Sequence, residues 1–380
     1  MRRAALLLAV VSVGCGFKAG GSAASSDAAP DDADDAGSDI APADADVPVD
    51  GTRTDWYDAR FLHRRKLTIA TNKLTGDVAG FPVLVTLPSA VGVDLTTGAN
   101  DLRFVSMDNT TVFPYELDTF NAAANTTAWV KLTLSKSDPT TTLWVYYGFP
   151  DATSSSNGAT VFGAFTSVHH LSNFGDSTAN NHTVSAVALS TPGPTAGAVG
   201  GAQSFDGNDD YLEMANSGGM NFTTTMSVSA WLKVSTFDKV YQCIVCKGDG
   251  AWRLARADMT NGVGFGTTTA TLNDNVNGNT SVSNGSWHHV VGVIDGTKKT
   301  LYVDGAKDLD ENFSSQLDNT STLVRLGMNV DSTTGGTRNW FGAIDEIRVT
   351  SAALGKDWVN AEYITVHDMT FVTVGADEAY

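Results

Sequence analysis

The sequence is poor in charged residues and in cysteine. Aspartate, glutamate, lysine and arginine make up 17% of its 380 residues, and cysteine occurs three times. The formal net charge of −18 disfavours nucleic acid and anionic lipid headgroups as partners, because both are negatively charged. The apolar run Ala4–Val13 is shorter than the roughly 20 residues of a membrane-spanning helix, and no later segment is a candidate. These shortages argue against a nucleic-acid-binding protein and against a protein with spanning helices.

Small and turn-forming residues are abundant instead. Glycine alone occurs 37 times, and threonine, serine and asparagine are frequent. This profile is typical of a turn-rich β protein from outside the cytoplasm and not of a helical enzyme. The length allows two domains of ordinary size, each with its own core.

The first 15 residues, MRRAALLLAVVSVGC, read as an export signal: two arginines precede an apolar run. The ending Val13-Gly14-Cys15 resembles the bacterial lipobox, in which the cysteine is lipidated and becomes the mature N-terminus. Ser12 departs from this pattern, which prefers an aliphatic residue there, and ordinary cleavage near Ala23-Ala24 is the alternative. We therefore expect an exported protein of the bacterial cell envelope, lipid-anchored through Cys15 at the outer membrane or cell surface, or else secreted.

Residues 16–53 have almost nothing to bury. Nine aspartates and no basic residue lie between Ala19 and Thr52, among alanine, proline, glycine and serine. Like charges repel one another and keep such a chain extended, so this segment is predicted to be a disordered acidic tether.

Short strand-like runs fill residues 54–152. RRKLTIAT, FPVLVTL, DLRFVSM, VFPYELDTF, AWVKLTL and TTLWVYYG alternate apolar and polar residues between Gly, Asn, Asp and Pro breaks. The strings WYDARFLHRRKLTI, FPYELDTF and LWVYYGFPDATSSS resemble the bacterial domain of unknown function 2341. That resemblance implies no settled activity, so this region is expected to be a first β-sandwich without an assigned role.

A second series of motifs extends from Val168 to Tyr363. In order they are HHLSNFGDSTANNH, GGAQSFDGNDDYLEM, TMSVSAWLKV, GSWHHVVGVIDG, TLYVDG and FGAIDEIRVTSAAL. Alternating runs between Gly/Asp/Asn turns predict an antiparallel sandwich. Their order resembles the laminin-G-like, concanavalin A-like lectin/glucanase family, which implies a jelly roll over residues 161–380. One helical segment, SAALGKDWVNAEY at 351–363, and a last strand, MTFVTVG, are expected at its end. The predicted fold class is therefore all-β, with two jelly-roll-like β-sandwiches after the tether.

Acidic residues do not predict a hydrolase. Some concanavalin A-like members are glucanases with carboxylates spaced E-x-D-x-x-E along one strand, where alternate residues face the same cleft. The nearest string, Tyr115-Glu116-Leu117-Asp118, lies in the first domain and is followed by no third acid. Asp345 and Glu346 are adjacent, so a regular strand points them to opposite faces. No G-x-S-x-G elbow or HExxH motif is present either, and we expect no enzyme.

The laminin-G-like resemblance also implies one structural Ca²⁺. Its ligands in this chain would be Asp176, Asp345 and groups around Asn180 and Asn181, because calcium takes six to eight oxygens. The alternative is that Asp176 caps an Asx-turn and that Asp345 pairs with Arg348 or with backbone amides.

Tryptophans are candidates for sugar stacking. Trp252 and Trp340 follow loops rich in Gly and Asn and are predicted at the sandwich rim, where aromatic faces stack on sugar rings. Their expected hydrogen-bonding companions are Arg338, Asn339 and Asp249, and the alternative for both rings is partial packing. Four other tryptophans are expected in the cores, from strand alternation or from the family pattern: Trp129, Trp144, Trp231 and Trp287.

Two cysteines and two histidine doublets have structural alternatives. Cys243 and Cys246 form either a local disulfide, which needs a bulge or turn because residues three apart in a strand face opposite sides, or two semi-buried thiols. No second CxxC completes a zinc site. In His169-His170 and His288-His289, one imidazole of each is expected in the core and the other in solvent, and packing is favoured over metal ligation.

Taken together, the sequence predicts an exported, lipid-anchored protein whose second sandwich binds a polysaccharide or glycoconjugate without catalysis. The alternative is protein–protein adhesion or envelope scaffolding, with a surface protein as the partner and no glycan ligand.

Overall fold

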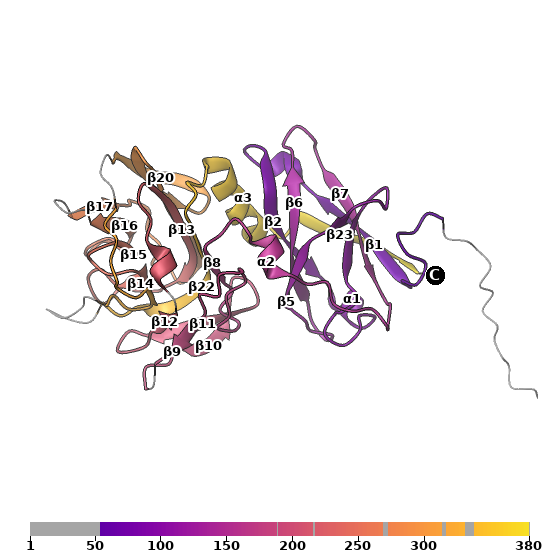
Figure 1. Ribbon diagram of the computed structural model, residues 1–380, viewed down its shortest axis with the longest axis horizontal. Coiled ribbons are helices and arrows are strands. Elements are labelled where there is room, and N and C mark those ends of the chain that lie inside the picture. The colour runs from indigo at the N-terminus through magenta and orange to yellow at the C-terminus, as the bar shows by residue number, and fades with distance from the viewer. Residues whose placement is uncertain are drawn as a thin grey trace, which may run out of the picture. The chain divides into compact units, whose positions relative to one another are not determined.

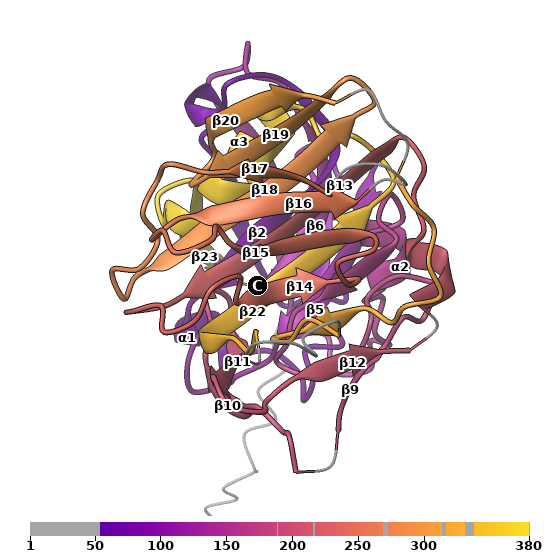
Figure 2. The same ribbon diagram turned by 90° about the vertical axis from the view of Figure 1, so that its left-hand side faces the viewer.

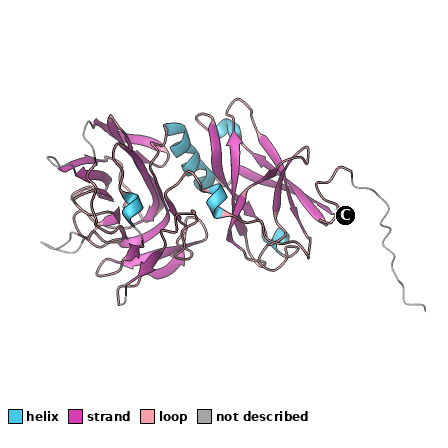
Figure 3. Cartoon of the chain, in the orientation of Figure 1, coloured by secondary structure: helices cyan, strands magenta, loops and turns pink. Residues whose placement is uncertain are grey.

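The computed structural model describes residues 54–187, 189–215, 217–268, 273–313, 317–330 and 338–379. They belong to one compact unit, Thr52–Tyr380, built almost entirely of strands (Figures 1 and 3). The predicted export signal, the lipidation site Cys15 and the acidic tether lie outside the described residues. Within the described ranges, no helix is both long enough and apolar enough to cross a bilayer.

The first sandwich consists of two antiparallel sheets. Buried side chains of both sheets meet in a core that includes Leu67, Val83, Phe104 and Val130. One sheet has three strands, in the order β2 (Val78–Leu87), β6 (Thr126–Leu134) and β5 (Tyr115–Thr119). The other has five, in the order β23 (Val372–Ala379), β1 (His63–Ile69), β7 (Thr141–Tyr147), β3 (Arg103–Ser106) and β4 (Val112–Phe113).

The last strand of the chain belongs to this first sandwich. β23 pairs antiparallel with β1, from Ile69 opposite Val372 to His63 opposite Ala379. The expected range of the jelly roll, 161–380, is therefore wrong at its C-terminal end. The second sandwich is an insertion between β7 and β23, and the five-stranded sheet of the first sandwich includes strands from both sides of this insertion.

The second sandwich also has two antiparallel sheets, which Figure 2 shows one behind the other. The first, with β8 (Ser167–His169) attached to β22, has the order β10 (Gly193–Ala196), β11 (Gly201–Asp206), β22 (Phe341–Thr350), β13 (Thr225–Lys233), β18 (Trp287–Asp295), β19 (Lys298–Val303) and β20 (Ala306–Asn312). The second has the order β17 (Asn273–Asn277), β16 (Val263–Thr268), β15 (Trp252–Arg256), β14 (Cys243–Cys246), β21 (Arg325–Leu326), β12 (Leu212–Met214) and β9 (Val184–Ala186). This architecture confirms the predicted all-β fold class.

Helices are few and short among the residues that the structure describes. The longest, α3 (Lys356–His367), overlaps the predicted helical segment and connects the second sandwich to β23. The other helical turns are η1 (Thr71–Lys73), α1 (Ser89–Gly92), α2 (Gly158–Val161) and η2 (Ser217–Met220).

The sheet that contains β13, β18 and β22 is covered on both faces. Its inner face packs in the core of the second sandwich, with Val228 and Val290 among its residues. On its outer face, Val291 and Val293 pack against Val359 of α3. A separate apolar cluster, which joins Leu84 and Trp129 of the first sandwich to Val168 and Val199 of the second, covers more of that face. Most side chains that alternation turns outward on these strands are therefore buried, against α3 or against the first sandwich.

Candidate functional site

A bulge in β22 gathers charged side chains on the outer face of the sheet. The pairing of β22 with β13 slips between Trp231, opposite Asp345, and Ser229, opposite Arg348, and Glu346 has a positive φ of 49°. The extra residue of a bulge breaks the alternation of side chains. Ile344 and Ile347 both enter the core, so Asp345 and Glu346 share the outer face. The expectation that these two carboxylates point to opposite faces is wrong for this reason.

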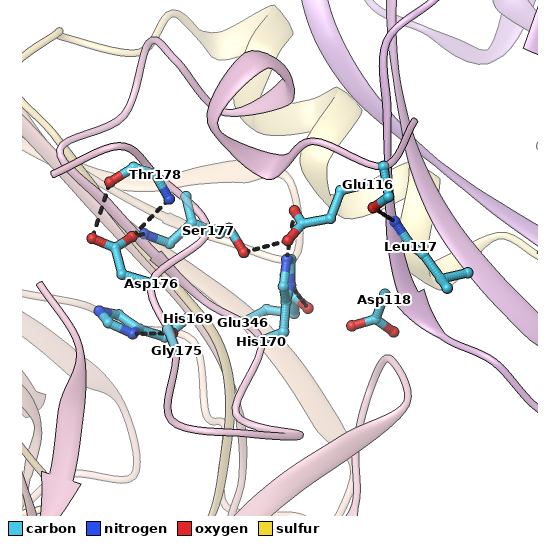
Figure 4. Close-up of polar contacts among 12 residues, drawn as sticks. Glu116, Leu117, Asp118, His169, His170, Gly175, Asp176, Ser177, Thr178 and Glu346 are labelled. Atoms are coloured by element: carbon cyan, nitrogen blue, oxygen red, sulfur yellow. Dashed lines mark hydrogen bonds and ion pairs between the residues drawn. The ribbon is translucent and has the colours of Figure 1, made fainter. Parts of the chain in front are cut away.

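The first sandwich faces this strand with two acids of its own. Glu116 and Asp118 are two residues apart on β5 and project from the same side of the strand toward His170, which directly follows β8 (Figure 4). His170 Nδ1 lies 2.6 Å from Glu346 Oε1, and its Nε2 lies 3.3 Å from Glu116 Oε2. One imidazole thus bridges carboxylates of the two sandwiches. We call Glu116, Asp118, His170 and Glu346 the junction cluster.

Neighbouring groups complete the junction cluster. Arg348 donates to Glu346 Oε2 at 2.9 Å, and its guanidinium lies 4.4 Å from the centre of the Trp129 ring. The His170 ring stacks on the same indole, with 5.9 Å between centroids. The contact of the Arg348 guanidinium with this indole agrees with the attraction of cations to π-systems.

The cluster holds its proton on the histidine. Burial opposes a charge on His170, but the carboxylates of Glu346 and Glu116 outweigh burial and raise the histidine pKa well above its ordinary value. Burial likewise opposes ionisation of Glu346, but His170 and Arg348 lower its pKa. We infer an imidazolium between carboxylates, which is an ion-pair arrangement and not a general base.

Two further carboxyls at the junction are driven toward the neutral form. Burial raises the pKa of Asp118, against a smaller opposite effect from His170. Burial and then the charge of Glu346 raise the pKa of Asp345 well above its usual range. Both shifts oppose the build-up of negative charge at this buried place.

The junction cluster has donors for a metal but little room for a substrate. Donor atoms of Asp118, His170 and Glu346 lie within 4.8 Å of one another, so these residues could hold a divalent cation once His170 lost its proton. The cavity beside them measures about 150 Å³, below the roughly 300 Å³ at which ligand pockets begin. Glu346 is fully buried, and both its oxygens are engaged. Acids meet here without forming the open cleft of a glycosidase.

A larger hollow, which we call the trough, lies close to the junction cluster. Its volume is about 660 Å³. Both sandwiches, the end of α3 and the residue Met369 beyond it line the trough: Leu84, Thr86, Thr119, Ala124, Asn125, Thr127, Gly197, Ala198, Val199, Gly200, Trp231, Trp287, Val366, His367 and Met369. It lies within the size range of small-molecule and saccharide sites.

Aromatic rings form one wall of the trough. Trp287 and Trp231 occupy outward positions at the adjoining ends of β18 and β13; Trp287 is half-buried, whereas Trp231 is 3% exposed. Trp231 stacks on Tyr363 of α3 at 5.9 Å and 13°, and Tyr363 stacks on His367 at 4.6 Å and 16°. Trp287 was expected in the core and instead offers part of its ring to the trough, because the cover of the outer face ends there.

Asp118 of the junction cluster and the neighbouring Asp345 hold another wall of the trough in place. Asp345 Oδ2 accepts a hydrogen bond from the Val199 amide at 3.0 Å, within the loop 197–200. Asp118 accepts hydrogen bonds from Thr127 at 2.7 Å and from Thr119 at 3.1 Å. A Cβ on Gly200, whose φ is +53°, would approach the Thr119 hydroxyl to 2.8 Å. Groups of both sandwiches that line the trough are thus fixed by Asp118 and Asp345.

The tryptophans predicted to stack on sugars are in the core. Trp252 is 1% exposed and Trp340 is 0% exposed, and both belong to the core of the second sandwich. Trp252 Nε1 donates to the Met220 carbonyl at 3.0 Å. The rim prediction is wrong for both rings, because Trp252 faces inward from β15 and Trp340 packs inside just before β22.

The three residues predicted to assist these tryptophans do not line a sugar site with them. Asn339 is 1% exposed and cannot reach a ligand. Arg338 and Asp249 remain partly exposed and form a salt bridge of 2.6 Å; burial raises the pKa of Asp249, but Arg338 outweighs it and lowers the pKa. Of the predicted companions, Arg338 and Asp249 therefore lie together, but they bind each other.

The residues expected to bind calcium have other hydrogen-bond partners. Both oxygens of Asp176 accept hydrogen bonds, from the amides of Val168, Thr178 and His182 and from the Thr178 hydroxyl. Asp345 accepts from the amides of Val199 and Glu346. Asn180 Nδ2 donates to a backbone carbonyl, and Asn181 has a positive φ of 57°. Among described residues, the two groups of clustered metal-ligating side chains include neither Asp176 nor Asp345. The calcium site stays a prediction.

Cys243 and Cys246 are joined by a disulfide. The pairing of β14 with β15 slips between Cys243 and Val245, which is the irregularity that a bond between residues three apart requires.

All four residues of the histidine doublets are buried, so the expectation of one solvent-facing ring in each doublet is wrong. His170 and His289 face the outer side of the sheet, and the first sandwich and α3 cover that side. Burial and the nearby Arg348 lower the pKa of His289 to about 3.

Comparison with family models confirms both resemblances drawn from the sequence. Residues 206–360 match the model of the concanavalin A-like lectin/glucanases superfamily. Residues 98–179 match the domain of unknown function DUF2341. No curated protein matches the chain at a significant level.

Among solved structures, three similar ones illustrate the fold. The binding domain of Paraclostridial mosquitocidal protein 1 has 13% identity and a TM-score of 0.45, over 54% of this chain and 52% of that chain. Domain 4 of AbnA, a GH43 extracellular arabinanase from Geobacillus stearothermophilus solved with arabinotriose, has 18% identity and a TM-score of 0.42, over 52% of this chain and 96% of that chain. The binding domain of botulinum neurotoxin serotype G has 12% identity and a TM-score of 0.41, over 50% of this chain and 47% of that chain. The chain thus spans about half the length of the two toxin domains, and these likenesses concern the fold alone.

Proposed function

We propose that this protein binds carbohydrate without catalysis, and that the trough at the junction of its two sandwiches is the binding site. The observation that carries the proposal is the wall of the trough around Trp287, a half-buried indole that lines the trough together with Trp231, which stacks on Tyr363. Aromatic faces pack against the apolar faces of sugar rings, and hydroxyl and amide groups bind sugar hydroxyls. The match to the concanavalin A-like superfamily supports a binding role for the second sandwich.

The absence of catalysis is part of the proposal. The acids of the junction cluster are committed to His170 and Arg348 or hydrogen-bonded to threonines, and the cavity beside them is too small for a sugar ring in a cleft. A general acid must reach the glycosidic oxygen, and the buried Glu346 does not have that access.

Export and lipid anchoring are proposed from residues 1–15 alone. The expected anchor, Cys15, is tested by metabolic labelling with a fatty acid. The natural chain should incorporate the fatty-acid label, and Cys15→Ser should not. Absence of label from the natural chain would contradict the lipid anchor and favour a secreted protein.

The binding proposal is tested on a panel of soluble polysaccharides. We expect at least one to bind the full chain, Trp287→Ala to lose about tenfold or more in affinity, and no reducing ends to appear on prolonged incubation. Trp56→Ala is the matched control, because Trp56 is another half-buried tryptophan, located outside the trough. Binding to no member of a broad panel would favour protein adhesion instead, and equal losses from both variants would place the site elsewhere.

A further inference from the structure

We propose that the first sandwich supplies half of the binding site, and that the ligand is a neutral polysaccharide bound along its chain by both sandwiches. This inference rests on the proposed carbohydrate-binding function and extends it. It gives a role to a domain whose family has no assigned function.

The trough continues onto the first sandwich as a second hollow. This adjoining hollow measures about 370 Å³ and reaches Val372 and Val374 of β23. Five lining residues belong to both hollows: Leu84, Thr86, Asn125, Val366 and Met369. Two adjoining hollows with shared walls suit consecutive units of a chain better than a single small molecule.

Side chains of the first sandwich offer polar groups that the protein itself does not use. Thr86 on β2 and Asn125 before β6 are both exposed, and neither side chain has a hydrogen-bond partner among the described residues. Thr119 and Thr127, by contrast, already donate to Asp118. The hydroxyl of Thr86 and the amide of Asn125 can therefore bind sugar hydroxyls without breaking an existing bond.

The chemistry of both hollows selects an uncharged ligand. No lysine or arginine lines either one, so a uronate or sulfate group would meet no cation there. Of the lining residues, His367 and Asp368 alone can ionise, and Asp368 is paired with Lys73 at 2.6 Å. The net charge of −18 further repels anionic polysaccharides.

The two halves are held together before the ligand arrives. His170 bridges Glu116 of the first sandwich and Glu346 of the second. The Leu84 amide of β2 donates to the Thr365 hydroxyl of α3 at 2.8 Å. A site fixed in this way costs less ordering on binding than two sandwiches that must dock around the chain.

The test uses the full chain and oligosaccharides of increasing length, prepared from the neutral polysaccharide that binds best. Affinity should rise by about tenfold or more from the disaccharide to the hexasaccharide, because longer chains reach the adjoining hollow. The double variant Thr86→Val/Asn125→Ala should lose about tenfold in affinity for the hexasaccharide, because both residues line the trough and the adjoining hollow. Asn72→Ala, an exposed asparagine of the first sandwich outside both hollows, should change neither affinity. Melting temperatures verify that each variant is folded.

Failure of this inference is distinguishable from failure of the proposed function. If Trp287→Ala abolishes binding while the double variant and ligand length have no effect, carbohydrate binding stands and the first sandwich has no part in it. If polygalacturonate or heparin binds more tightly than every neutral polysaccharide, the neutral class is wrong. If the natural chain binds no polysaccharide, the proposed function itself is wrong.

Discussion

Replacing His170 by leucine should strongly destabilise the folded chain. The change removes the imidazolium between Glu116 and Glu346 and leaves a fully buried carboxylate with less compensation. Removing one partner of a buried ion pair costs about 3–5 kcal/mol. Glu346 keeps Arg348, and Glu116 keeps Ser177, so we expect the lower end, about 3 kcal/mol.

The matched control is His288→Leu. His288 lies 2.8 Å from Asp304, whose side chain is 31% exposed, so water compensates for much of the lost pair. We expect His288→Leu to lower the free energy of unfolding by about 1 kcal/mol or less. Both variants are measured by urea unfolding at pH 6.

The pH dependence gives a second reading of the same variant. His170 has a folded-state pKa well above the unfolded value of about 6.5, so its stabilisation is complete below that pH and is lost as the pH rises through the folded-state pKa. The stability gap between the natural chain and His170→Leu should therefore be largest near pH 6 and narrow in alkali. A loss below about 1 kcal/mol at pH 6, or a gap that widens with pH, would refute the imidazolium bridge.

Four further outcomes are expected. Burial and Glu346 raise the folded-state pKa of Asp345 above its unfolded value of about 3.9. The natural chain should therefore lose stability as the pH rises from the unfolded pKa through the folded-state pKa. In urea unfolding at pH 5 and pH 8, Asp345→Asn should show a smaller loss of stability between the two pH values. Trp252→Ala should cost about 3–5 kcal/mol in unfolding free energy while leaving carbohydrate affinity unchanged, and a specific loss of affinity would return this ring to the binding site. Reducing the Cys243–Cys246 disulfide, which closes a very short loop, should cost about 2 kcal/mol, checked by melting with and without reductant. A chain without residues 372–379 should expose β1 to protease, and protection equal to that of the full chain would contradict the role of β23.

The fold class could be predicted because strands show a two-residue alternation of apolar and polar residues in the sequence. Alternating runs such as TMSVSAWLKV became β13, and RRKLTIAT became β1. Which sheet a strand joins is set by pairing across the chain, and a strand's own pattern does not contain that information. MTFVTVG was therefore recognised as a strand but assigned to the wrong sandwich.

The candidate site was largely missed, for two physical reasons. At the bulge, Glu346 adopts a left-handed backbone conformation that few residues other than glycine adopt. The sequence GAIDEIRV contains no residue pattern that predicts this bulge. The outer face of the sheet is buried by a second sandwich, so side chains that alternation assigns to solvent, such as His170, lie inside. β22 has eight consecutive buried positions, but its sequence does not show them, because it contains the charged residues Asp345, Glu346 and Arg348.

The tryptophans show the limit of reading exposure from flanking loops. Gly and Asn before Trp252 and Trp340 indicate a turn, but a turn does not determine on which side the next ring enters. Trp287 follows a similar turn, GNTSVSNGS, and is the ring that reaches the trough.

The location of a bound sugar tests the central claim most directly. A crystal structure of the full chain with a neutral oligosaccharide should show a sugar ring against the Trp287 indole in the trough, with the junction cluster closed behind it. Density for the oligosaccharide on the Asp249–Arg338 face of the second sandwich, or an oligosaccharide cleaved beside Glu116 and Asp118, would contradict the account.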